Sequence, residues 1–555
     1  MSKRAFASLF IAVFLLGAVL RLARLDLRPM HHDEANQALK FGLLLEKGEY
    51  RYDPADHHGP SLYYVSLPFA LALSGRSLAA LTETTLRLVT ASFGLGTILL
   101  FLLFVPLMGR AAVAWGSLAL AVSPVMGYFN RFYIQETILV LFLAGFVAAV
   151  WRYLRRPGWG WAAAAGFCAG MMYATKETSI IAFGAVAAGL LLVRSIGHRG
   201  AAGEKEGRRA ARGGPLNEEK PPAGLRLEPA DGPARVPGTK DKAATGRVWL
   251  HWLVCLGAAT TVAFLLFSSF FKNPGGLIDS ILSFKIYFAR AGEGGFHVQP
   301  WHYYLGTLAF SPGHGGPFWS EGLILLLALA GAVAAFISKR LSRENTSFLR
   351  FLVCYSALAA AVYSAIPYKT PWNLLPFYIG FILLAGSGAA ALAALPRRNV
   401  AKLGVTFLLA AGFLQLGFQS YRANFVYAAD TRNPYVYAQT SLDFMRLVRR
   451  VEDIAAFTPE GRNMLIKVIA GPYETWPLPW NLRRFGRVGY WQDAAAAGDI
   501  DRPPVIISSA EETGKIEPVL NTDYQSEFYG LRPDVLLTLS IRNDLWESFL
   551  RSRAR

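Results

Sequence analysis

The sequence predicts a mainly α-helical protein that crosses a membrane many times and ends in a small α/β domain. Of its 555 residues, 53% are hydrophobic and only 17% are charged. The hydrophobic residues are concentrated in runs of about twenty, the length that an α-helix needs to cross a bilayer. After about residue 420 these runs stop, and shorter apolar segments follow. The chain is therefore predicted to divide into a membrane domain, 1–420, and a soluble domain, 421–555.

About eleven apolar segments are long enough to span the membrane. They are 6–23, 84–108, 111–128, 137–153, 160–175, 178–195, 248–271, 321–338, 349–366, 372–394 and 403–420. The first follows the basic pair Lys3 and Arg4 and has no clear small-x-small cleavage site, which predicts an uncleaved signal anchor with a cytoplasmic N-terminus. The loops then alternate between a basic set and a set rich in acidic pairs and histidines, as the positive-inside rule requires. This alternation places the C-terminal domain outside the cytoplasm.

Charge and cysteine content exclude two other classes of protein. The formal net charge is +18, but the basic residues lie mostly in short segments between apolar runs, which indicates membrane topology and not nucleic-acid binding. The three cysteines, Cys168, Cys255 and Cys354, each lie inside an apolar run without CxxC spacing. Neither a disulfide framework nor a zinc-cysteine site is predicted.

The connecting segments differ in character. Two long loops, 24–83 and 272–320, are predicted to be extracytoplasmic, and the apolar stretch 61–75 is too short to span and is expected to lie along the interface. Residues 196–247 are rich in Gly, Ala, Pro and mixed charge, which predicts a disordered cytoplasmic linker. In the C-terminal domain, a helix is predicted at 441–457, and strands at 464–471, 487–491, 503–509 and 534–542.

The stretch MHHDEANQA gathers His31, His32, Asp33 and Glu34 just after the first predicted span. Solvated carboxylates at a membrane surface cost little, so these residues could simply decorate a loop. Against this, the residues that follow fit a short amphipathic helix with the acidic pair at its N-terminal end. The same loop also turns back on itself through a Gly-Pro step, beside a second polar cluster that contains His57 and His58.

The later outer turns carry further charged residues. NRFYIQETILV places Arg131 and Glu136 at the head of a predicted span, where a carboxylate could also be an ordinary helix cap. YATKETSI contains Lys176 beside Glu177, and adjacent residues on a helix are expected to serve different partners. IPYKTPWNLLPF contains Lys369 and Trp372, of which the tryptophan is by default an interfacial anchor.

Together these residues predict a chemistry. A carboxylate suits a general base that deprotonates a hydroxyl. The cations Arg131, Lys176 and Lys369 suit a phosphate leaving group. Both are needed to move a group from a lipid-linked phosphate to a hydroxyl at the membrane surface.

This arrangement resembles the GT-C superfamily of integral membrane glycosyltransferases, in which an Asp-Glu pair opens a long extracytoplasmic loop after the first span. Within it, the chain is similar to the protein mannosyltransferase-like group, glycosyltransferase family 39. It looks closest to a prokaryotic subfamily called flippase activity-associated, through HHDEA at 31–35, PYKTPWN at 367–373 and YETWPLPW at 473–480. The resemblance covers 1–420 well and the C-terminal domain only through the last stretch.

The resemblance implies a function. The enzyme would reside in a prokaryotic plasma membrane and transfer a sugar, with inversion, from polyprenyl phosphate to a protein, lipid or glycan acceptor outside the cytoplasm. Asp33 would be the general base, with Glu34 beside it, and Glu136 matches a second acidic position that is often Asp in the family. Arg131, Lys176 and Lys369 would bind the donor phosphate.

The sequence leaves open which metal ion, if any, the site binds and which further residues contact the substrate. Some members of the superfamily need a divalent cation: oxygen ligands would suit Mg²⁺ or Mn²⁺, whereas His31 and His32 could draw zinc. Further substrate or metal contacts are expected from His57, His58 and Trp372. The aromatic stretch 473–480 is either a packing surface against the membrane domain or a platform for a sugar or protein acceptor.

Two other functions compete with an enzyme. A transporter-like or flippase-associated protein without chemistry of its own would place charges within its spans and show internal repeats, and the sequence shows few such charges and no convincing repeat. A scaffold that only presents the C-terminal domain would leave the loops of Asp33 and Glu136 unexplained. The sequence therefore favours an enzyme.

Overall fold

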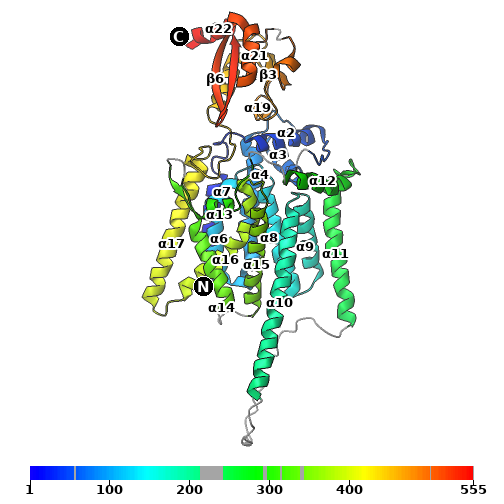
Figure 1. The fold of residues 1–555 in the computed structure, drawn as a ribbon, viewed down its shortest axis with the longest axis vertical. Helices are drawn as coiled ribbons and strands as arrows, with labels where there is room; N and C mark the ends of the chain where they lie inside the picture. Colours follow the sequence, from blue (N-terminus) through cyan, green and yellow to red (C-terminus); the bar gives the residue numbers. More distant parts are fainter. Residues whose placement is uncertain are drawn as a thin grey trace, which may run out of the picture.

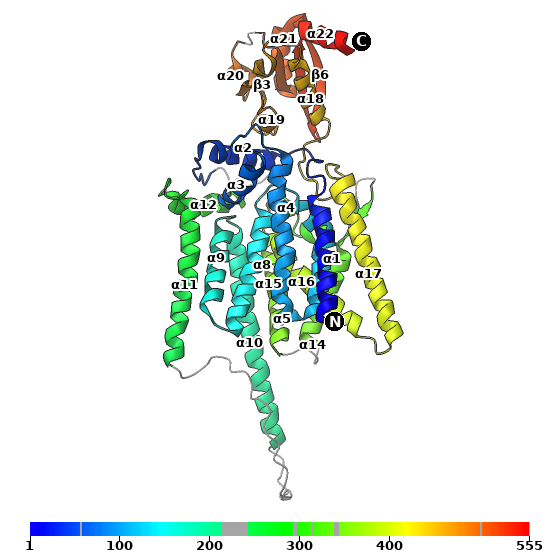
Figure 2. The same ribbon diagram turned by 180° about the vertical axis from the view of Figure 1, so that it is seen from behind.

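The computed structural model describes residues 1–55, 58–212, 242–291, 297–312, 316–337, 343–499 and 502–553. In this part of the chain, long helices form a bundle, short helices lie across one end of it, and a compact α/β domain sits beyond that end (Figure 1, Figure 2). The helices of the bundle are α1 (Lys3–Leu22), α4 (Glu83–Leu100), η1 (Phe101–Phe104), α5 (Val105–Met108), α6 (Arg110–Val122), α7 (Pro124–Asn130), α8 (Glu136–Arg155), α9 (Trp159–Tyr173), α10 (Ser179–Arg212), α11 (Lys242–Phe267), α14 (Gly322–Ile337), α15 (Arg343–Ala365), η2 (Pro371–Leu374), α16 (Leu375–Ala394) and α17 (Asn399–Tyr421).

All eleven predicted spans coincide with helices, but fewer reach spanning length. Among the described residues, eight helices are long and apolar enough to cross a membrane, and α6 with α7 makes a ninth if this pair, bent by 61°, is counted as one span. The other two predicted spans are α9 and α14, which have only 15 and 16 residues. All eleven predicted segments are thus helical, and eight or nine of them reach the length and apolar character of a full span.

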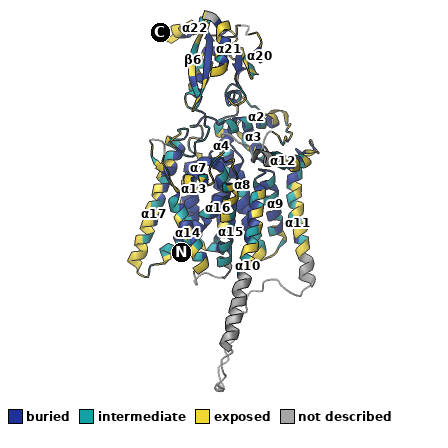
Figure 3. Ribbon diagram, in the orientation of Figure 1, coloured by how far each residue is buried: buried dark blue, intermediate teal, exposed yellow. Residues whose placement is uncertain are grey.

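The outer helices expose apolar side chains, as contact with lipid requires. Along α17, Leu403, Phe407 and Leu414 are more than 70% exposed, and Trp252 and Leu256 on α11 are more than 60% exposed. Figure 3 shows these exposed faces on the two flanks of the bundle. Large apolar side chains in such numbers would be unstable in water, so the bundle is an integral, multi-pass membrane domain.

The bend between α6 and α7 is fixed by a buried carboxylate. Glu321 accepts hydrogen bonds from the Ser123 hydroxyl at 2.9 Å, the backbone N–H of Val125 at 2.8 Å and the Tyr378 hydroxyl at 2.6 Å. The N–H of Val125 is one of the donors that the start of a helix leaves without a partner. Glu321 thus turns the chain toward the loop that carries Arg131.

The predicted linker is shorter in the structure than in the sequence analysis. Residues 196–247 were expected to be disordered, but α10 continues to Arg212 and α11 begins at Lys242. The alanine-rich, oppositely charged stretch after residue 200 is compatible with helix, which the composition argument overlooked. The middle of the predicted linker, 213–241, lies outside the described residues.

Three helices lie across the end of the bundle: α2 (His32–Lys47), α3 (Ser61–Leu73) and α12 (Gly276–Ala291) (Figure 1). The amphipathic helix predicted after the Asp-Glu pair is α2. It starts with a capping box, in which the His31 side chain accepts from the Asp33 N–H and Glu34 accepts from the His31 N–H, and it ends at Gly48, whose φ of 66° favours glycine. The short apolar stretch 61–75 is α3, and the long loop 272–320 holds α12, α13 (Tyr303–Ala309) and a two-stranded hairpin, β1 (Ser311–Pro312) with β2 (Phe318–Trp319).

The C-terminal domain is built on a five-stranded mixed sheet in the order β4-β3-β5-β7-β6. Strands β3 (Leu465–Ile469), β4 (Arg487–Trp491) and β5 (Val505–Ser509) are parallel, and β6 (Tyr524–Arg532) and β7 (Val535–Arg542) are antiparallel. One face packs on α18 (Phe444–Ala455) and α22 (Asn543–Arg553), and the other on α21 (Ala510–Leu520). The four predicted strands are present. The edge strand β6 was missed, because YQSEFYGLR alternates polar and apolar residues only loosely and contains a glycine.

The C-terminal domain contacts the membrane domain through α19 (Leu478–Asn481) and the residues beside it. Trp480 is fully buried, and its indole N–H donates to Glu83 at the start of α4 at 2.7 Å. The guanidinium of Arg483 lies 3.6 Å from the centre of the Trp480 ring and donates to the Leu78 and Leu81 carbonyls. At Trp480, therefore, the YETWPLPW stretch is a packing surface.

Trp480→Ala is expected to loosen this contact. Removing a buried tryptophan costs roughly 3–5 kcal/mol of packing, and here the loss falls on the contact between the two domains. We expect faster proteolytic cleavage in the connecting segment 427–443 with the membrane domain intact. Trp480→Phe keeps most of the packing and should lose only about 1 kcal/mol with the hydrogen bond. Equal cleavage rates for wild type and Trp480→Ala would contradict the role of Trp480 in docking.

Candidate functional site

Glu34 is a buried structural anchor. Its carboxylate is fully buried and accepts two hydrogen bonds from Arg87, at 2.8 and 2.7 Å, and one from the backbone N–H of Tyr133 at 2.9 Å. Burial alone raises the pKa of Glu34, but the charges of Arg87 and Arg28 and these hydrogen bonds more than offset it, and the pKa falls to about 2. The resemblance placed Glu34 in the catalytic pair. With both oxygens held by α4 and the loop after α7, it positions the start of α2 instead.

Asp33, the residue before it, has the opposite environment. Its side chain is 43% exposed, while the side chain of Glu34 is 0% exposed. The backbone N–H of Asp33 donates to His31 Nδ1 at 3.0 Å, so the capping box fixes the backbone position of Asp33. Two later segments bring His297 and Tyr437 into its electrostatic field. Asp33 is therefore a rigidly placed carboxylate that a substrate can reach.

The two histidines of the motif are held by the protein and are neutral. His31 Nδ1 accepts from the Asp33 N–H, so Nε2 carries the hydrogen and donates to the Tyr437 carbonyl at 3.0 Å. Burial lowers the pKa of His31, and burial lowers the pKa of His32 to about 4. The ring of His32 stacks on Trp476, with centroids 5.7 Å apart.

These contacts bear on the question of a metal ion. With both ring nitrogens of His31 engaged, this side chain offers no lone pair to zinc. Across the residues that the structure describes, no group of three or more His, Cys, Asp or Glu side chains is arranged to hold a metal ion.

Trp372 closes the inner side of the site and is not a membrane anchor. It is 7% exposed, and its ring packs against His31, Phe132 and Tyr437 at centroid distances of 5.8, 5.9 and 5.9 Å. An interfacial anchor would face the lipid headgroups, and a ring that contacts substrate would be more open. The default assignment to the aromatic belt was wrong, because the prolines of PYKTPWN turn Trp372 inward.

Glu136 and Lys176 form a buried ion pair. Lys176 Nζ contacts Glu136 Oε1 and also donates to Asn373 Oδ1 at 3.1 Å, and both charged side chains are about 95% buried. Glu136 stands at the start of α8, where the helix dipole favours a carboxylate. Because Asn373 follows Trp372 directly, this pair lies next to the aromatic wall of the Asp33 site.

The neighbouring Glu177 has a separate partner, as expected for adjacent residues. His58 Nδ1 lies 2.8 Å from Glu177 Oε2. Gly59 lets the two loops touch, since a Cβ there would come within 2.3 Å of the Ala174 carbonyl oxygen. The hydrogen bond of His58 thus holds its loop against the turn that carries Glu177. His57 lies outside the described residues.

Arg131 and Lys369 point into the protein rather than toward a ligand. Arg131 donates to the carbonyls of Ala23 and Arg24 at 2.6 and 2.8 Å, capping the end of α1. Lys369 Nζ donates to the Ile366 and Gln299 carbonyls at 2.5 and 3.0 Å, and burial lowers the pKa of Lys369. The sequence shows a cation but not its partner, so both were assigned to the donor phosphate. The structure gives them backbone carbonyls instead.

A chain of contacts links the segments of the predicted site. His31, which accepts from the Asp33 N–H, packs against Trp372; the adjacent Asn373 contacts Lys176, and Lys176 contacts Glu136. The sequence analysis left three members of this cluster out of the site. Arg87 had a signal, since a cation inside an apolar span is rarely without a function or partner. His297 was one of several charged or aromatic residues in a long loop, and Tyr437 had no signal at all.

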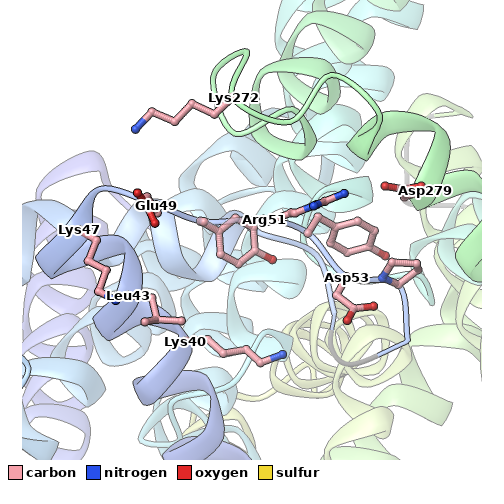
Figure 4. Close-up of a pocket in the computed structure, with 11 residues that line it drawn as sticks. Lys40, Leu43, Lys47, Glu49, Arg51, Asp53, Lys272 and Asp279 are labelled. Carbon is pink, nitrogen blue, oxygen red and sulfur yellow. The ribbon is translucent and has the colours of Figure 1, made fainter.

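A pocket of about 910 Å³ opens beside the same helix (Figure 4). Figure 4 shows its basic and acidic side chains around the opening between α2, the 49–54 loop and the start of α12. Lys40, Leu43 and Lys47 of α2 line it at the spacing of one helix face, and Asp33 stands on that face seven residues before Lys40. At 1.5 Å per residue, Lys40 is about 10 Å along the helix from Asp33. The remaining lining residues are Glu49, Tyr50, Arg51, Tyr52, Asp53, Pro54, Lys272 and Asp279.

Residues 67–202 match the sequence model of a family described as dolichyl-phosphate-mannose-protein mannosyltransferase. The structure is similar to ArnT from Cupriavidus metallidurans in the apo state, with a TM-score of 0.57 and 16% identity over 98% of this chain and 99% of that one. ArnT bound to undecaprenyl phosphate gives 0.56 and 16% over 97% and 98%. The archaeal oligosaccharyltransferase AglB from Archaeoglobus fulgidus, in complex with an inhibitory peptide and a dolichol-phosphate, gives 0.50 and 12% over 98% and 77%. No curated protein matches this chain in sequence.

The shared fold shows a multi-pass membrane protein with a GT-C-like fold. The segment that matches the dolichyl-phosphate-mannose-protein mannosyltransferase model contains Arg87, Glu136 and Lys176. This match favours an enzyme over the transporter-like alternative.

Proposed function

We propose that the chain transfers a sugar from a polyprenyl-phosphate donor to an acceptor hydroxyl, with inversion at the anomeric carbon and with Asp33 as general base. The family description names a dolichyl-phosphate-linked sugar, and relatives of the same fold have been seen with undecaprenyl phosphate and dolichol-phosphate. The observation that carries the proposal is the contrast between two adjacent carboxylates. The side chain of Glu34 is fully buried, whereas that of Asp33 is 43% exposed at the start of α2.

The proposed reaction is a single displacement. The Asp33 carboxylate takes the proton of the acceptor hydroxyl as its oxygen attacks the anomeric carbon. The bond from that carbon to the phosphate oxygen breaks on the opposite side, and the polyprenyl phosphate leaves with the electron pair. One attack from the far side inverts the anomeric centre. The ion pair of Glu136 and Lys176 supports the wall of the site through Asn373.

For the donor phosphate we propose the cations along α2. Arg131, Lys176 and Lys369 are buried, whereas Lys47 is exposed and Lys40 partly exposed, and both of these lysines line the pocket on the Asp33 face. Lys272 lies on the opposite side of this pocket. Of these, Lys40 would extend its side chain back along the helix toward Asp33 and neutralise the charge that develops on the leaving phosphate, while Lys47 and Lys272 would attract the anionic donor into the pocket.

The orientation is also a proposal. We place the N-terminus in the cytoplasm and the C-terminal domain outside, because Lys3 and Arg4 precede α1 and the loops at that end of the bundle are basic. The site then faces the extracytoplasmic side of a prokaryotic plasma membrane. The finer resemblance to the flippase activity-associated subfamily rests on HHDEA, PYKTPWN and YETWPLPW, and it supports the same orientation.

The test uses the purified protein in proteoliposomes with labelled polyprenyl-phosphate sugars. Wild type should transfer or release the sugar from this donor, and Lys40→Gln combined with Lys47→Gln should raise the KM for the donor at least tenfold with a smaller change in kcat. The lysine charges would contact the donor phosphate in the bound substrate as well as in the transition state, so their removal should weaken donor binding more than it slows the chemical step.

Lys402→Gln, an exposed lysine at the other end of the bundle, is the matched control and should leave the KM unchanged. An unchanged donor KM in the double variant would remove these lysines from the donor site. Use of nucleotide sugars in place of lipid-linked ones would overturn the proposed function.

A further inference from the structure

The loop that follows β3 reaches from the C-terminal domain down to the start of α2. In this loop, 471–480, the Thr475 hydroxyl donates to the Ala470 carbonyl at 2.9 Å, and the fully buried Trp480 fixes the far end. Figures 1 and 2 both place α19 between the domain and α2. The loop is therefore held at both ends, and its middle lies over the residue next to Asp33.

Two aromatic side chains project from the middle of this loop in different environments. Trp476 is half-buried and stacks on His32, with the two ring planes 21° apart. Tyr473 is 76% exposed, an unusual state for a tyrosine beside an interface between domains. Packing explains Trp480 but not Tyr473, because an exposed ring adds nothing to the contact that holds the domain.

Charged groups stand beside these rings. Arg532, at the end of β6, donates to the Tyr473 carbonyl, and its charge acts on both His32 and Glu474. The guanidinium is therefore held against the loop and lies within electrostatic range of the first turn of α2. We call His32, Tyr473, Trp476 and Arg532 the aromatic platform.

The chemistry of the platform suits a carbohydrate. The C–H face of a pyranose packs on flat apolar rings, and its hydroxyls bind guanidinium and carboxylate groups. His32 adds a neutral ring directly beside the carboxylate of Asp33. A sugar ring lying on Tyr473 and Trp476 would therefore present a hydroxyl near Asp33.

We propose that the aromatic platform binds the acceptor, and that the acceptor is a glycan. This inference rests on the proposed function, because it takes Asp33 as the base that the acceptor hydroxyl must reach. The C-terminal domain then supplies acceptor recognition, while α2 and the pocket beside it supply the donor side. A protein acceptor, recognised without sugar, is the alternative outcome of the test.

The test measures binding first and turnover second. Saturation-transfer NMR on the full-length protein in nanodiscs, without donor, uses the octyl glycosides of glucose, mannose, galactose and N-acetylglucosamine, and a serine- and threonine-containing peptide. We expect at least one glycoside to bind, with its ring protons in contact with aromatic side chains, and Tyr473→Ala and Trp476→Ala to weaken this binding at least tenfold. Trp476→Phe should retain most of it, because a flat ring remains.

Steady-state kinetics then distinguish an effect on the acceptor from an effect on the donor. In the platform variants, the KM for the acceptor should rise at least tenfold, while the KM for the donor and the slow transfer of sugar to water stay within twofold of wild type. Tyr490→Ala is the matched control, since this tyrosine is 39% exposed on β4, at the opposite edge of the sheet from β6. Tyr473 is so exposed that its removal should not disturb folding, so Tyr473→Ala keeps the proposal testable even if Trp476→Ala unfolds.

Either of two results would overturn the inference: no glycoside binds, or the platform variants bind and use glycosides as well as wild type does. Binding of the peptide alone would assign the platform to a protein acceptor and would also overturn it. These outcomes are distinct from failure of the proposed function, in which wild type would bind a glycoside but release no sugar from a polyprenyl-phosphate donor.

Discussion

Asp33→Asn is expected to lower the rate of sugar transfer by roughly 10²- to 10⁴-fold, the usual contribution of a general base. Asparagine has nearly the same size and shape as aspartate but cannot accept the acceptor proton. The backbone N–H of residue 33, which donates to His31, is unchanged by the substitution, so the capping box and α2 should persist. Initial rates with saturating donor and acceptor measure the loss.

Two further measurements make this result specific. The thermal unfolding midpoint of Asp33→Asn should stay close to that of wild type, and binding of polyprenyl phosphate should be retained. Asp33→Glu should recover part of the activity, because the carboxylate returns at a displaced position. Turnover of Asp33→Asn within a few-fold of wild type would remove Asp33 as the base.

Glu34→Gln is expected to be the most destabilising substitution in the membrane-surface layer, at about 3–5 kcal/mol, because it leaves Arg87 and Arg28 buried without their counter-charge. Arg87 lies in α4 and its side chain is 1% exposed, so water cannot replace the lost partner. The expected result is a lower unfolding midpoint and loss of activity together. This pairing distinguishes Glu34 from Asp33, whose substitution should remove activity alone.

The Glu34 carboxylate makes the stability of the folded protein depend on pH in the acidic range. The pKa of Glu34 is about 2 in the folded protein and 4.5 as its ordinary value, so its contribution to stability is fully present above about pH 4.5 and is lost as the pH falls toward 2. Unfolding midpoints measured between pH 6 and pH 3 should fall for wild type and fall less for Glu34→Gln. Glu517→Gln, at an exposed position, should follow wild type. Identical curves for wild type and Glu34→Gln would contradict the buried ion pair.

The helices were predictable from the sequence, but their lengths were not. An apolar run reports that a segment is buried or in lipid, and it contains no signal for the residue at which helix gives way to turn. The window 160–175 therefore included Ala174 and Thr175, whose backbone forms the turn to Lys176. Four strands were predictable from runs of β-branched and aromatic residues, whereas β6 is defined by its pairing with β7.

The position of the acidic pair and the helix after it were predictable, but the surroundings of the individual side chains were not. HHDEA gave the position of the pair, and the amphipathic spacing of the residues that follow gave the helix. Which of Asp33 and Glu34 is exposed depends on Arg87, 53 residues away from Glu34, and a single sequence contains no record of that contact. The partners of Arg131 and Lys369 were unpredictable for the same reason, since they are backbone carbonyls that carry no sequence signature.

The first turns of α4 contact both the C-terminal domain and the start of α2. Glu83 accepts from Trp480, and Arg87, one helical turn later, holds Glu34. One helix thus fixes the position of the C-terminal domain relative to Asp33. An acceptor bound to that domain would be held at a fixed distance from Asp33. The length of the acceptor, and not only its chemical groups, would then decide whether its hydroxyl can react.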